Sequence, residues 1–588
     1  MSSGSGSWEQ VVAIVLVCAT TFAIGAMGLR LSRTTSDFYV ASRAIDPRWN
    51  ASAIGGEYLS AASFLGVAGL ILAYGTDMLW YPIGYTAGYL VLLVLVSAPL
   101  RRSGAYTLPD FAEMRLGDPR MRRLAAVLVV AIGCLYLIPQ FQGAGLALRT
   151  VTGTPAWVGT LLVAVVVLTN VAAGAMRSIT LLQAVQYWLK LTAIAVPVVL
   201  LLIAWHLDGS PDPAAPDPVA RHAISLTVPD TVTVEVRTPV TMTLHGTLDG
   251  HRVDGVTTLG PGTARIGGGT HVDLPAGAVV PEATGLAADD GARWAVPGAA
   301  EGNRNHSLYR TYSLLIALLL GTMGLPHVLV RFYTNPDGRA ARRTTLIVVA
   351  LLGAFYLFPP VYGAIGRLYA PDLLLTGHTD TVVLEIPRRL LPAPWGDLTA
   401  ALLTAGAFAA FLSTSGGLAI SVAGVLSRDL FPGRSGRRGF RAAAALVIGT
   451  AGALSLFPVH TGLADTVGLA FALAASTFCP LLVLGIWWRR LTVAGAAAGM
   501  VVGGLGAGTA ILLTLGGIPR SGLAAALVAQ PAAWSVPAAF LTMVLVSLAT
   551  RRGATPATGR IMVRLHTPES LDVDRGETPP APRFRARR

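Results

Sequence analysis

Apolar runs of transmembrane length recur along almost the whole chain, and this feature restricts the possible folds more than any other. Each run is close to the roughly 20 residues that an α-helix needs to cross a hydrocarbon core of about 30 Å. Charged residues make up only 13% of the 588 residues, whereas a soluble domain carries about 25%. Most of the chain must therefore lie where water is absent, and the sequence predicts an all-α integral membrane protein.

We expect about thirteen transmembrane helices. The first apolar run lacks a basic flank and a small-residue cleavage site, so we interpret it as a span and not as a signal peptide. The expected spans are residues 9–29, 51–73, 78–99, 124–147, 156–175, 178–205, 309–330, 344–367, 397–426, 441–457, 464–486, 493–515 and 533–550.

Arginine is concentrated in every second connection between these spans. Basic residues in short loops face the cytoplasm, so the alternation predicts an N-terminus outside and a cytoplasmic C-terminus in a plasma (inner) membrane. The same loops explain the net charge of +13 without a nucleic-acid partner. The arginine-rich connections contain Arg33 to Arg48, Arg101 to Arg123, Arg177, Arg331 to Arg343, Arg428 to Arg438, Arg489 with Arg490, and the tail from Arg551.

Composition divides the chain into four parts. Residues 1–205 hold the first six spans and residues 309–550 hold the other seven. Between them, residues 206–308 are polar and contain alternating and glycine-punctuated stretches typical of short strands, so we expect a small β-rich extracellular insert. Residues 551–588 are rich in Pro and Arg, and we expect a disordered basic cytoplasmic tail.

The second span contains Gly55 and Gly56 followed by Glu57. Each glycine weakens a helix by about 1 kcal/mol, and a discontinuous membrane helix exposes carbonyl and amide groups that can bind ions and solutes. The alternative is close helix packing through small residues. Packing does not require an acid, so Glu57 favours a role in gating or coupling, because acids inside a span are costly.

Two other spans carry polar groups. The ninth has three successive hydroxyls, Ser413 to Ser415, which can ligate a hard cation or bond back to their own helix. The sixth holds Lys190, the only lysine of the chain, at helical spacing from Gln183 and Gln186. Lysine can shift its pKa where arginine cannot. We expect Lys190 to pair with Glu57 or to meet an anionic solute; the alternative is an ion pair with a purely structural role.

Pro326 should kink or break the seventh span. His327, which follows it, is either an interfacial residue near Arg331 or a contact of the solute.

These segments resemble the sodium/solute symporter family, and within it the bacterial cation–acetate symporters. The resemblance extends from Asp37 to about Gly499. It rests on five motifs, which are Asp37–Ala41, Gly56–Gly66, Gly324–Tyr333, Ser427–Phe431 and Trp488–Thr492 followed by Gly495. It implies the inverted-repeat fold of the leucine-transporter type with one additional N-terminal helix, so that the second and ninth spans become the first and eighth helices of the core.

The resemblance also implies a sodium ion between the second and ninth spans. Its ligands would be backbone oxygens of Gly56, Leu59 and Ala410 and the hydroxyls of Ser413 and Thr414. An acid that the family often has early in the sixth span is missing, since Ile179 and Thr180 stand there, although Gln183 fits. The retained hydroxyl pair favours sodium over protons.

The implied function is symport, in which inward flow of sodium or protons drives uptake of a small monocarboxylate such as acetate, propionate or pyruvate. A carboxylate suits the N-terminus of a broken helix. We expect Ser60, Ser63 and Gln140 to contact it and Tyr58 to shape its pocket. Other solutes of the same fold (proline, a sugar, pantothenate) and a membrane solute sensor are the alternatives. The sequence has no catalytic constellation and indicates no cofactor apart from sodium as co-substrate.

Overall fold

The structure is a computed structural model. It describes residues 8–28, 45–173, 176–214, 218–284, 286, 294–295, 306–430, 436–457, 462–518, 522–550, 556–569 and 571. The motif Asp37–Ala41 lies outside these residues, as do Arg33, Arg43, Arg434 and Arg551.

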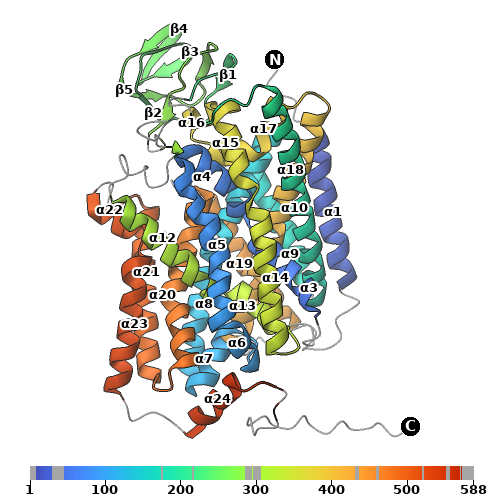
Figure 1. Cartoon of the computed structure of the whole chain (residues 1–588), viewed down its shortest axis with the longest axis vertical. Helices are drawn as coiled ribbons and strands as arrows, with labels where there is room; N and C mark the ends of the chain where they lie inside the picture. The colour runs from blue at the N-terminus through green and yellow to red at the C-terminus, as the bar shows by residue number, and fades with distance from the viewer. Residues whose placement is uncertain are drawn as a thin grey trace.

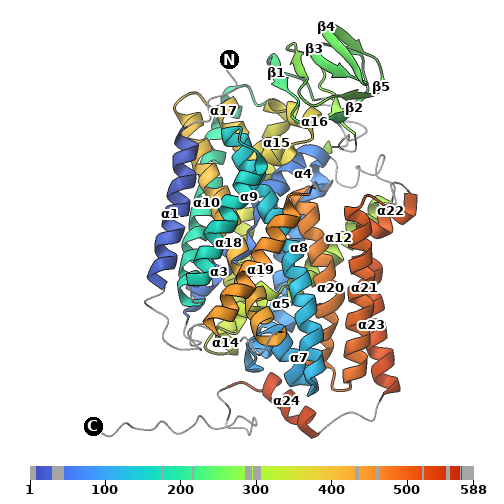
Figure 2. The ribbon, with the colours of Figure 1, turned by 180° about the vertical axis from the view of Figure 1, so that it is seen from behind.

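Long helices run side by side to form an upright bundle with a small β-sheet at one end (Figure 1). Helices α1, α10 and α18 lie on one side of the bundle and α21 and α23 on the other, as the reverse view confirms (Figure 2). The first half comprises α1 (Trp8–Gly28), α3 (Pro47–Tyr58), the π-helix η2 (Ala62–Gly66), α4 (Val67–Tyr74), η3 (Gly75–Leu79), α5 (Trp80–Leu95), α6 (Ser97–Arg102), α7 (Leu108–Leu116), α8 (Pro119–Thr152), α9 (Ala156–Ala173) and α10 (Met176–Leu207).

The second half of the bundle follows the sheet in the sequence. It comprises α12 (Ser307–Gly321), η5 (Thr322–Gly324), α13 (Pro326–Phe332), α14 (Gly338–Tyr356), α15 (Pro359–Tyr369), α16 (Asp372–Thr376), η6 (Thr379–Thr381), α17 (Val382–Leu390), α18 (Trp395–Val425), η7 (Leu426–Leu430), α19 (Arg437–Ser455), α20 (Leu463–Trp487), α21 (Val493–Leu515), α22 (Gly522–Ala529), α23 (Ala532–Ala549) and α24 (Pro556–His566).

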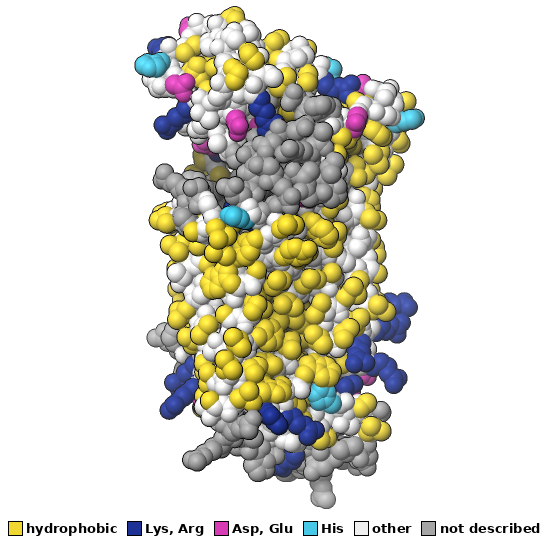
Figure 3. Space-filling model, turned by 60° about the vertical axis from the view of Figure 1, so that its left-hand side comes forward, with side chains coloured by type: hydrophobic (Ala, Val, Ile, Leu, Met, Phe, Trp, Pro, Cys, Tyr) yellow, Lys and Arg dark blue, Asp and Glu magenta, His cyan; other side chains and the backbone are white. Residues whose placement is uncertain are grey.

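Among the described residues, 10 helical segments are long and apolar enough to cross a membrane, or up to 11 if one bent pair counts as a span. The expected thirteen differ in two places. Residues 62–95 pass as one segment, whereas we expected two spans there, and α19 is less apolar because it carries Arg438 and Arg441. Figure 3 shows the hydrophobic band and the basic side chains that gather below it, away from the sheet. The count of thirteen and the orientation in the membrane stay predictions.

Two of the membrane helices are broken near their middle. The first breaks after Tyr58, where Leu59 is extended at φ −72° and ψ 92°, and resumes as η2 and α4. The second breaks at Leu325, extended at φ −76° and ψ 115°, and α13 starts at Pro326 with a bend of 46°. Pro326 can only begin a helix here, because it has no N–H to continue the hydrogen-bond ladder. Both interruptions match the expectations from Gly55–Gly56 and from Pro326.

The glycine pair of α3 also permits close packing. A Cβ atom on Gly56 would lie 2.1 Å from the carbonyl oxygen of Gln183, and one on Gly55 would lie 2.9 Å from the ring of Tyr187. Both neighbours belong to α10. Gly55 and Gly56 therefore serve the two purposes that the sequence left open: a helix that ends early and a backbone pressed against α10.

Residues 224–283 form seven antiparallel strands in the order β1-β6-β3-β5-β2-β7, with β4 paired to β3. The strands are β1 (Ile224–Thr227), β2 (Val232–Val236), β3 (Val240–Leu248), β4 (His251–Leu259), β5 (Gly262–Ile266), β6 (His271–Leu274) and β7 (Glu282–Ala283). Its own apolar core includes Leu375 of α16, which ties the sheet to the bundle. Trp294 adds a second tie, since its indole donates to the carbonyls of Ile71 (2.8 Å) and Leu72 (3.1 Å) in α4.

The expectation of a wholly disordered tail is wrong for residues 556–569. Helix α24 packs beneath the bundle at the end opposite the sheet (Figures 1 and 2). Leu565 is fully buried, and Glu569 accepts hydrogen bonds from Arg102 at 3.3 Å and from the Gly338 amide at 2.9 Å. The Pro- and Arg-rich composition hid a short amphipathic segment, whose apolar side chains find a partner surface only in the folded bundle.

We expect Leu565→Asp to release α24 from the bundle. A buried leucine replaced by a smaller side chain costs about 2–5 kcal/mol, and an unpaired carboxylate adds a desolvation penalty. Limited trypsin digestion at Arg560 and Arg564 should then become faster in the purified protein. Val563→Asp is the matched control, because Val563 is 37% exposed and should cleave like the wild type. Equal protection of both variants would contradict the docking.

Candidate cation and solute site

The break in the first broken helix leaves backbone carbonyls without helical partners, and side chains of α18 donate hydrogen bonds to them. The Ser413 hydroxyl donates to the Gly56 carbonyl at 2.7 Å, and the Thr414 hydroxyl donates to the Glu57 carbonyl at 2.7 Å. Ser413 also lies 3.1 Å from the carbonyl oxygen of Ala410. The structure thus brings Gly56, Ala410, Ser413 and Thr414 together inside the bundle. Their role as cation ligands stays a prediction.

Lys190 reaches into the same group of oxygens. Its ammonium donates to the Leu59 carbonyl at 2.7 Å, to the Ser413 hydroxyl at 2.8 Å and to the Gly56 carbonyl. The side chain is fully buried. Lys190 therefore contacts three of the five predicted sodium ligands, an arrangement that the sequence did not predict.

The expected ion pair between Lys190 and Glu57 does not form; among the described residues Glu57 pairs with Arg331 of α13, at 2.8 Å. Both side chains are only 1% exposed. The guanidinium also donates to the hydroxyl of Thr180 at 2.7 Å and to the side-chain oxygen of Gln183. A planar guanidinium offers five donors in a fixed fork, so it can donate to the Glu57 carboxylate, Thr180 and Gln183 at once.

Gln183 links this ion pair to Ser413. Its oxygen accepts from Arg331, and its amide donates to the Ser413 carbonyl at 2.9 Å. Thr180, which stands where the resemblance leads us to expect an acid, and Gln183 therefore both accept hydrogen bonds from Arg331. Gln186, on the same helical face, instead donates to Thr21 of α1 at 3.1 Å.

A group of aromatic side chains surrounds the break on the other side. We name Tyr58, Tyr85, Tyr89, Tyr136, Tyr356 and Phe471 the aromatic cluster. Their ring centroids lie 4.9 to 6.1 Å apart in successive contacts, for example 4.9 Å between Tyr58 and Tyr89. His327 lies against the Tyr136 ring at 5.2 Å and is fully buried. His327 thus lies inside the bundle against the aromatic cluster, and both interpretations of its role stay predictions.

The four predicted solute residues all lie at this cluster. The Tyr58 hydroxyl is 3.2 Å from both the Tyr85 carbonyl and the Thr322 hydroxyl. The Ser63 hydroxyl bonds to the Tyr356 hydroxyl at 2.8 Å, and the buried Ser60 hydroxyl has no hydrogen-bond partner among the described residues. Gln140 accepts a hydrogen bond from the Ala61 amide at 3.0 Å, so it caps the broken helix. Their contact with a solute stays a prediction.

Several members of this site were not predicted from the sequence. Tyr81, Tyr85 and Tyr89 recur every four residues and lie on the buried face of α5. This spacing was a usable signal, because tyrosines that share one face of a membrane helix must find polar partners or a ligand. Arg331 was counted only as a loop arginine, since its place at the end of an apolar run fits the charge rule equally well.

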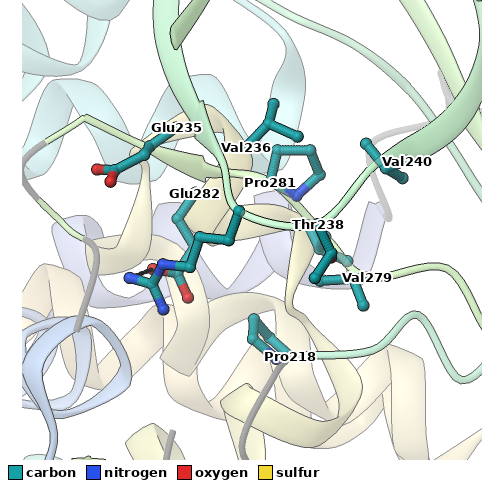
Figure 4. A pocket seen from close by; sticks show the side chains of 10 residues that line it. Pro218, Glu235, Val236, Thr238, Val240, Val279, Pro281 and Glu282 are labelled. Carbon is teal, nitrogen blue, oxygen red and sulfur yellow. Dashed lines mark ion pairs between the residues drawn. The ribbon is translucent and has the colours of Figure 1, made fainter. Parts of the chain in front are cut away.

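The sheet carries a small pocket of a different kind (Figure 4). It is lined by residues of β2, β7 and the neighbouring loops, and Arg237 faces Glu282 across it at 3.6 Å. The pocket belongs to the insert and not to the broken helices. Among the described residues no group of three or more His, Cys, Asp or Glu side chains is placed to hold a metal ion.

Two interrupted helices packed against α10 and α18 inside an all-helical bundle define a transporter of the leucine-transporter fold. The sodium:solute symporter family profile matches residues 38–244 and 284–503, and the chain belongs to this family. The family implies sodium as the co-substrate of its members.

Sequence relatives agree with this assignment, and a solved structure agrees with the fold. A monocarboxylic acid transporter of Corynebacterium glutamicum is 29% identical over 511 residues, 84% of this chain and 81% of that protein. An uncharacterised symporter of Bacillus subtilis is 28% identical over 496 residues, 83% and 82% of the two chains. The outward-open, substrate-bound structure of a Na⁺-coupled sialic acid symporter aligns with a TM-score of 0.60 at 14% identity, covering 93% of this chain and 98% of that one.

We expect Gly417→Ala to damage the site while Gly416→Ala is tolerated. A Cβ atom on Gly417 would lie 1.9 Å from the Glu57 carboxylate, whereas one on Gly416 would meet nothing within 4 Å. Overpacking of this kind costs about 1–3 kcal/mol and should push Glu57 away from Arg331. Thermal stability of the purified variants, with solute uptake as the second readout, measures the difference. Equal loss in both variants would mean that contact with the Glu57 carboxylate is not the cause, since alanine by itself favours a helix over glycine.

Proposed function

We propose that this protein is a secondary active symporter that couples inward flow of sodium or protons to uptake of a small monocarboxylate such as acetate, propionate or pyruvate. The observation that carries the proposal is the broken helix Pro47–Tyr74, whose interruption joins two sets of polar groups. Carbonyls of Gly56 and Leu59 face α10 and α18, while Tyr58 lies in the aromatic cluster. A cation held by these carbonyls and a solute can thus act on the same four residues of backbone, 56–59.

Unused hydrogen-bond donors support a carboxylate as the solute. The hydroxyls of Tyr85 and Tyr89 and the ring of His327 are buried, and none has a hydrogen-bond partner within the described part of the chain. A neutral imidazole contributes one N–H donor and one acceptor nitrogen. A buried polar group without a partner costs about 1–3 kcal/mol. A bound carboxylate would satisfy such donors, and the close spacing of the rings favours a small molecule. The name of the Corynebacterium relative points in the same direction.

Coupling follows from differential affinity. A ligand shifts a conformational equilibrium only if it binds one state more tightly, and groups on α3, α10 and α18 can approach a cation or solute only while these helices are close together. Rocking of one bundle against the other would then expose the site to alternate sides. At a membrane potential of 100 mV each inward elementary charge supplies about 2.3 kcal/mol.

Uptake by the purified protein in proteoliposomes tests the proposal. Labelled acetate, propionate and pyruvate should accumulate under an imposed inward gradient of sodium or protons, and collapse of both gradients should stop accumulation. Labelled proline, glucose and pantothenate test the alternative solutes under the same gradients. Accumulation of one of these without accumulation of acetate, propionate or pyruvate would replace the monocarboxylate assignment.

Tyr85→Phe should raise KM for the monocarboxylate by about tenfold or more, because a hydrogen bond to a charged group contributes about 1.5–3 kcal/mol. The variant should not be less stable than the wild type, since the hydroxyl that it removes has no protein partner among the described residues. Uptake kinetics and thermal unfolding separate the two effects. Tyr312→Phe is the control, because Tyr312 is 63% exposed. An unchanged KM in Tyr85→Phe would remove this hydroxyl from the solute site.

A further inference from the structure

Lys190 holds the place at which the family resemblance puts a sodium ion. We propose that its ammonium is the resident cation of this site and that it excludes sodium from the oxygens of Gly56, Leu59 and Ser413. Lys190 would then determine the cation specificity of the symporter. The role of Lys190 in a symporter rests on the proposed function. Its occupancy of the site does not, because occupancy is a property of the protein alone.

The Lys190 ammonium uses the oxygens that a sodium ion would need. A lysine ammonium has three N–H donors and no acceptor. All three directions are used here, by the Gly56 carbonyl, the Leu59 carbonyl at 2.7 Å and the Ser413 hydroxyl at 2.8 Å. These are the oxygens that would have to turn toward a sodium ion. The ammonium and the ion therefore need the same acceptors.

The charge of Lys190 also repels a sodium ion. Glu57, the nearest acid, is already paired with Arg331 at 2.8 Å, and Lys190 forms no ion pair within the part of the chain that the structure describes. The positive charge of Lys190 is thus held by neutral oxygens, as a bound sodium ion would be. Two unit charges about 4 Å apart repel enough, at the effective dielectric of a protein, to weaken binding of the second by roughly a thousandfold.

Lys190 joins the same helices that a bound sodium ion would join. Lys190 lies on α10, and its three acceptors lie on the end of α3, on the break at Leu59 and on α18. A tethered ammonium can hold these three segments together in the way a bound ion would, yet it cannot leave the protein. It is also the only lysine in the chain, whereas arginine, with its larger planar head, occupies every other non-histidine cationic position.

Removal of the ammonium should create a sodium site. In purified Lys190→Ala the oxygens of Gly56, Leu59, Ala410, Ser413 and Thr414 remain, without the charge that repels the ion. We expect NaCl to raise the melting temperature of this variant above its value in KCl or choline chloride of equal ionic strength. The double variant Lys190→Ala/Ser413→Ala should lose that sodium-specific increase, because it lacks one ligand. Lys190→Ser is the second vacating variant, and its hydroxyl should preserve the response if the alanine variant folds poorly.

The wild type supplies a test that needs no vacating variant. Any sodium-specific stabilisation of the wild type should be the same in Ser413→Ala, because sodium does not use this hydroxyl while Lys190 is present. Loss of a wild-type sodium response in Ser413→Ala would overturn the proposal. So would a sodium response that Lys190→Ala abolishes or leaves unchanged from the wild type. None of these measurements uses an organic acid, so an incorrect solute assignment would leave their result intact.

Discussion

Where a helix stops in the middle of a bilayer, its free carbonyl groups must accept hydrogen bonds from donors outside the helix, and this requirement organises the centre of the protein. Hydrocarbon offers no hydrogen bonds, so each unsatisfied backbone group costs several kcal/mol. The break after Tyr58 frees the carbonyls of Gly56, Glu57 and Leu59. Donors arrive from two neighbours, as hydroxyls on α18 and as the ammonium of Lys190 on α10. The polar residues of three helices are therefore explained by one interruption.

The same low dielectric explains the ion pair beside the break. A buried charge is tolerated only when it is paired and hydrogen-bonded. Glu57 pairs with Arg331 through one carboxylate oxygen, and Gln183 accepts from the same guanidinium, while the other oxygen of Glu57 has no hydrogen-bond partner among the described residues. Arg331 belongs to α13, the second half of the other broken helix. The pair thus joins the two interrupted helices. Because breaking such a pair leaves one charge uncompensated, at a cost of about 3–5 kcal/mol, the two helices should change position together.

Local chemistry decided how much of this could be predicted. The interruption at Gly55–Gly56 and the one at Pro326 follow from the backbone properties of glycine and proline, and hydroxyls within an apolar span had to face an acceptor. Partner choice was not predictable, because Glu57 could reach either of two cations and only the fold places Arg331 nearer. Helix α24 could not be predicted for a related reason, because its apolar face can be buried only where the ends of α6 and α7 provide a surface. Sequence thus indicates where polar groups are needed, and the tertiary structure assigns their partners.

A fixed cation in the bundle has a consequence for energy coupling. A carboxylate that enters a cell against an inside-negative potential of 100 mV costs about 2.3 kcal/mol per charge, so at least one positive charge must travel with each anion before any accumulation is possible. An ammonium tethered to α10 cannot make that journey. If Lys190 is the resident cation, the travelling charge must use atoms other than the carbonyls of Gly56 and Leu59 and the hydroxyl of Ser413. The structure then separates two tasks that one sodium ion would combine, which are holding the helices together and carrying charge inward.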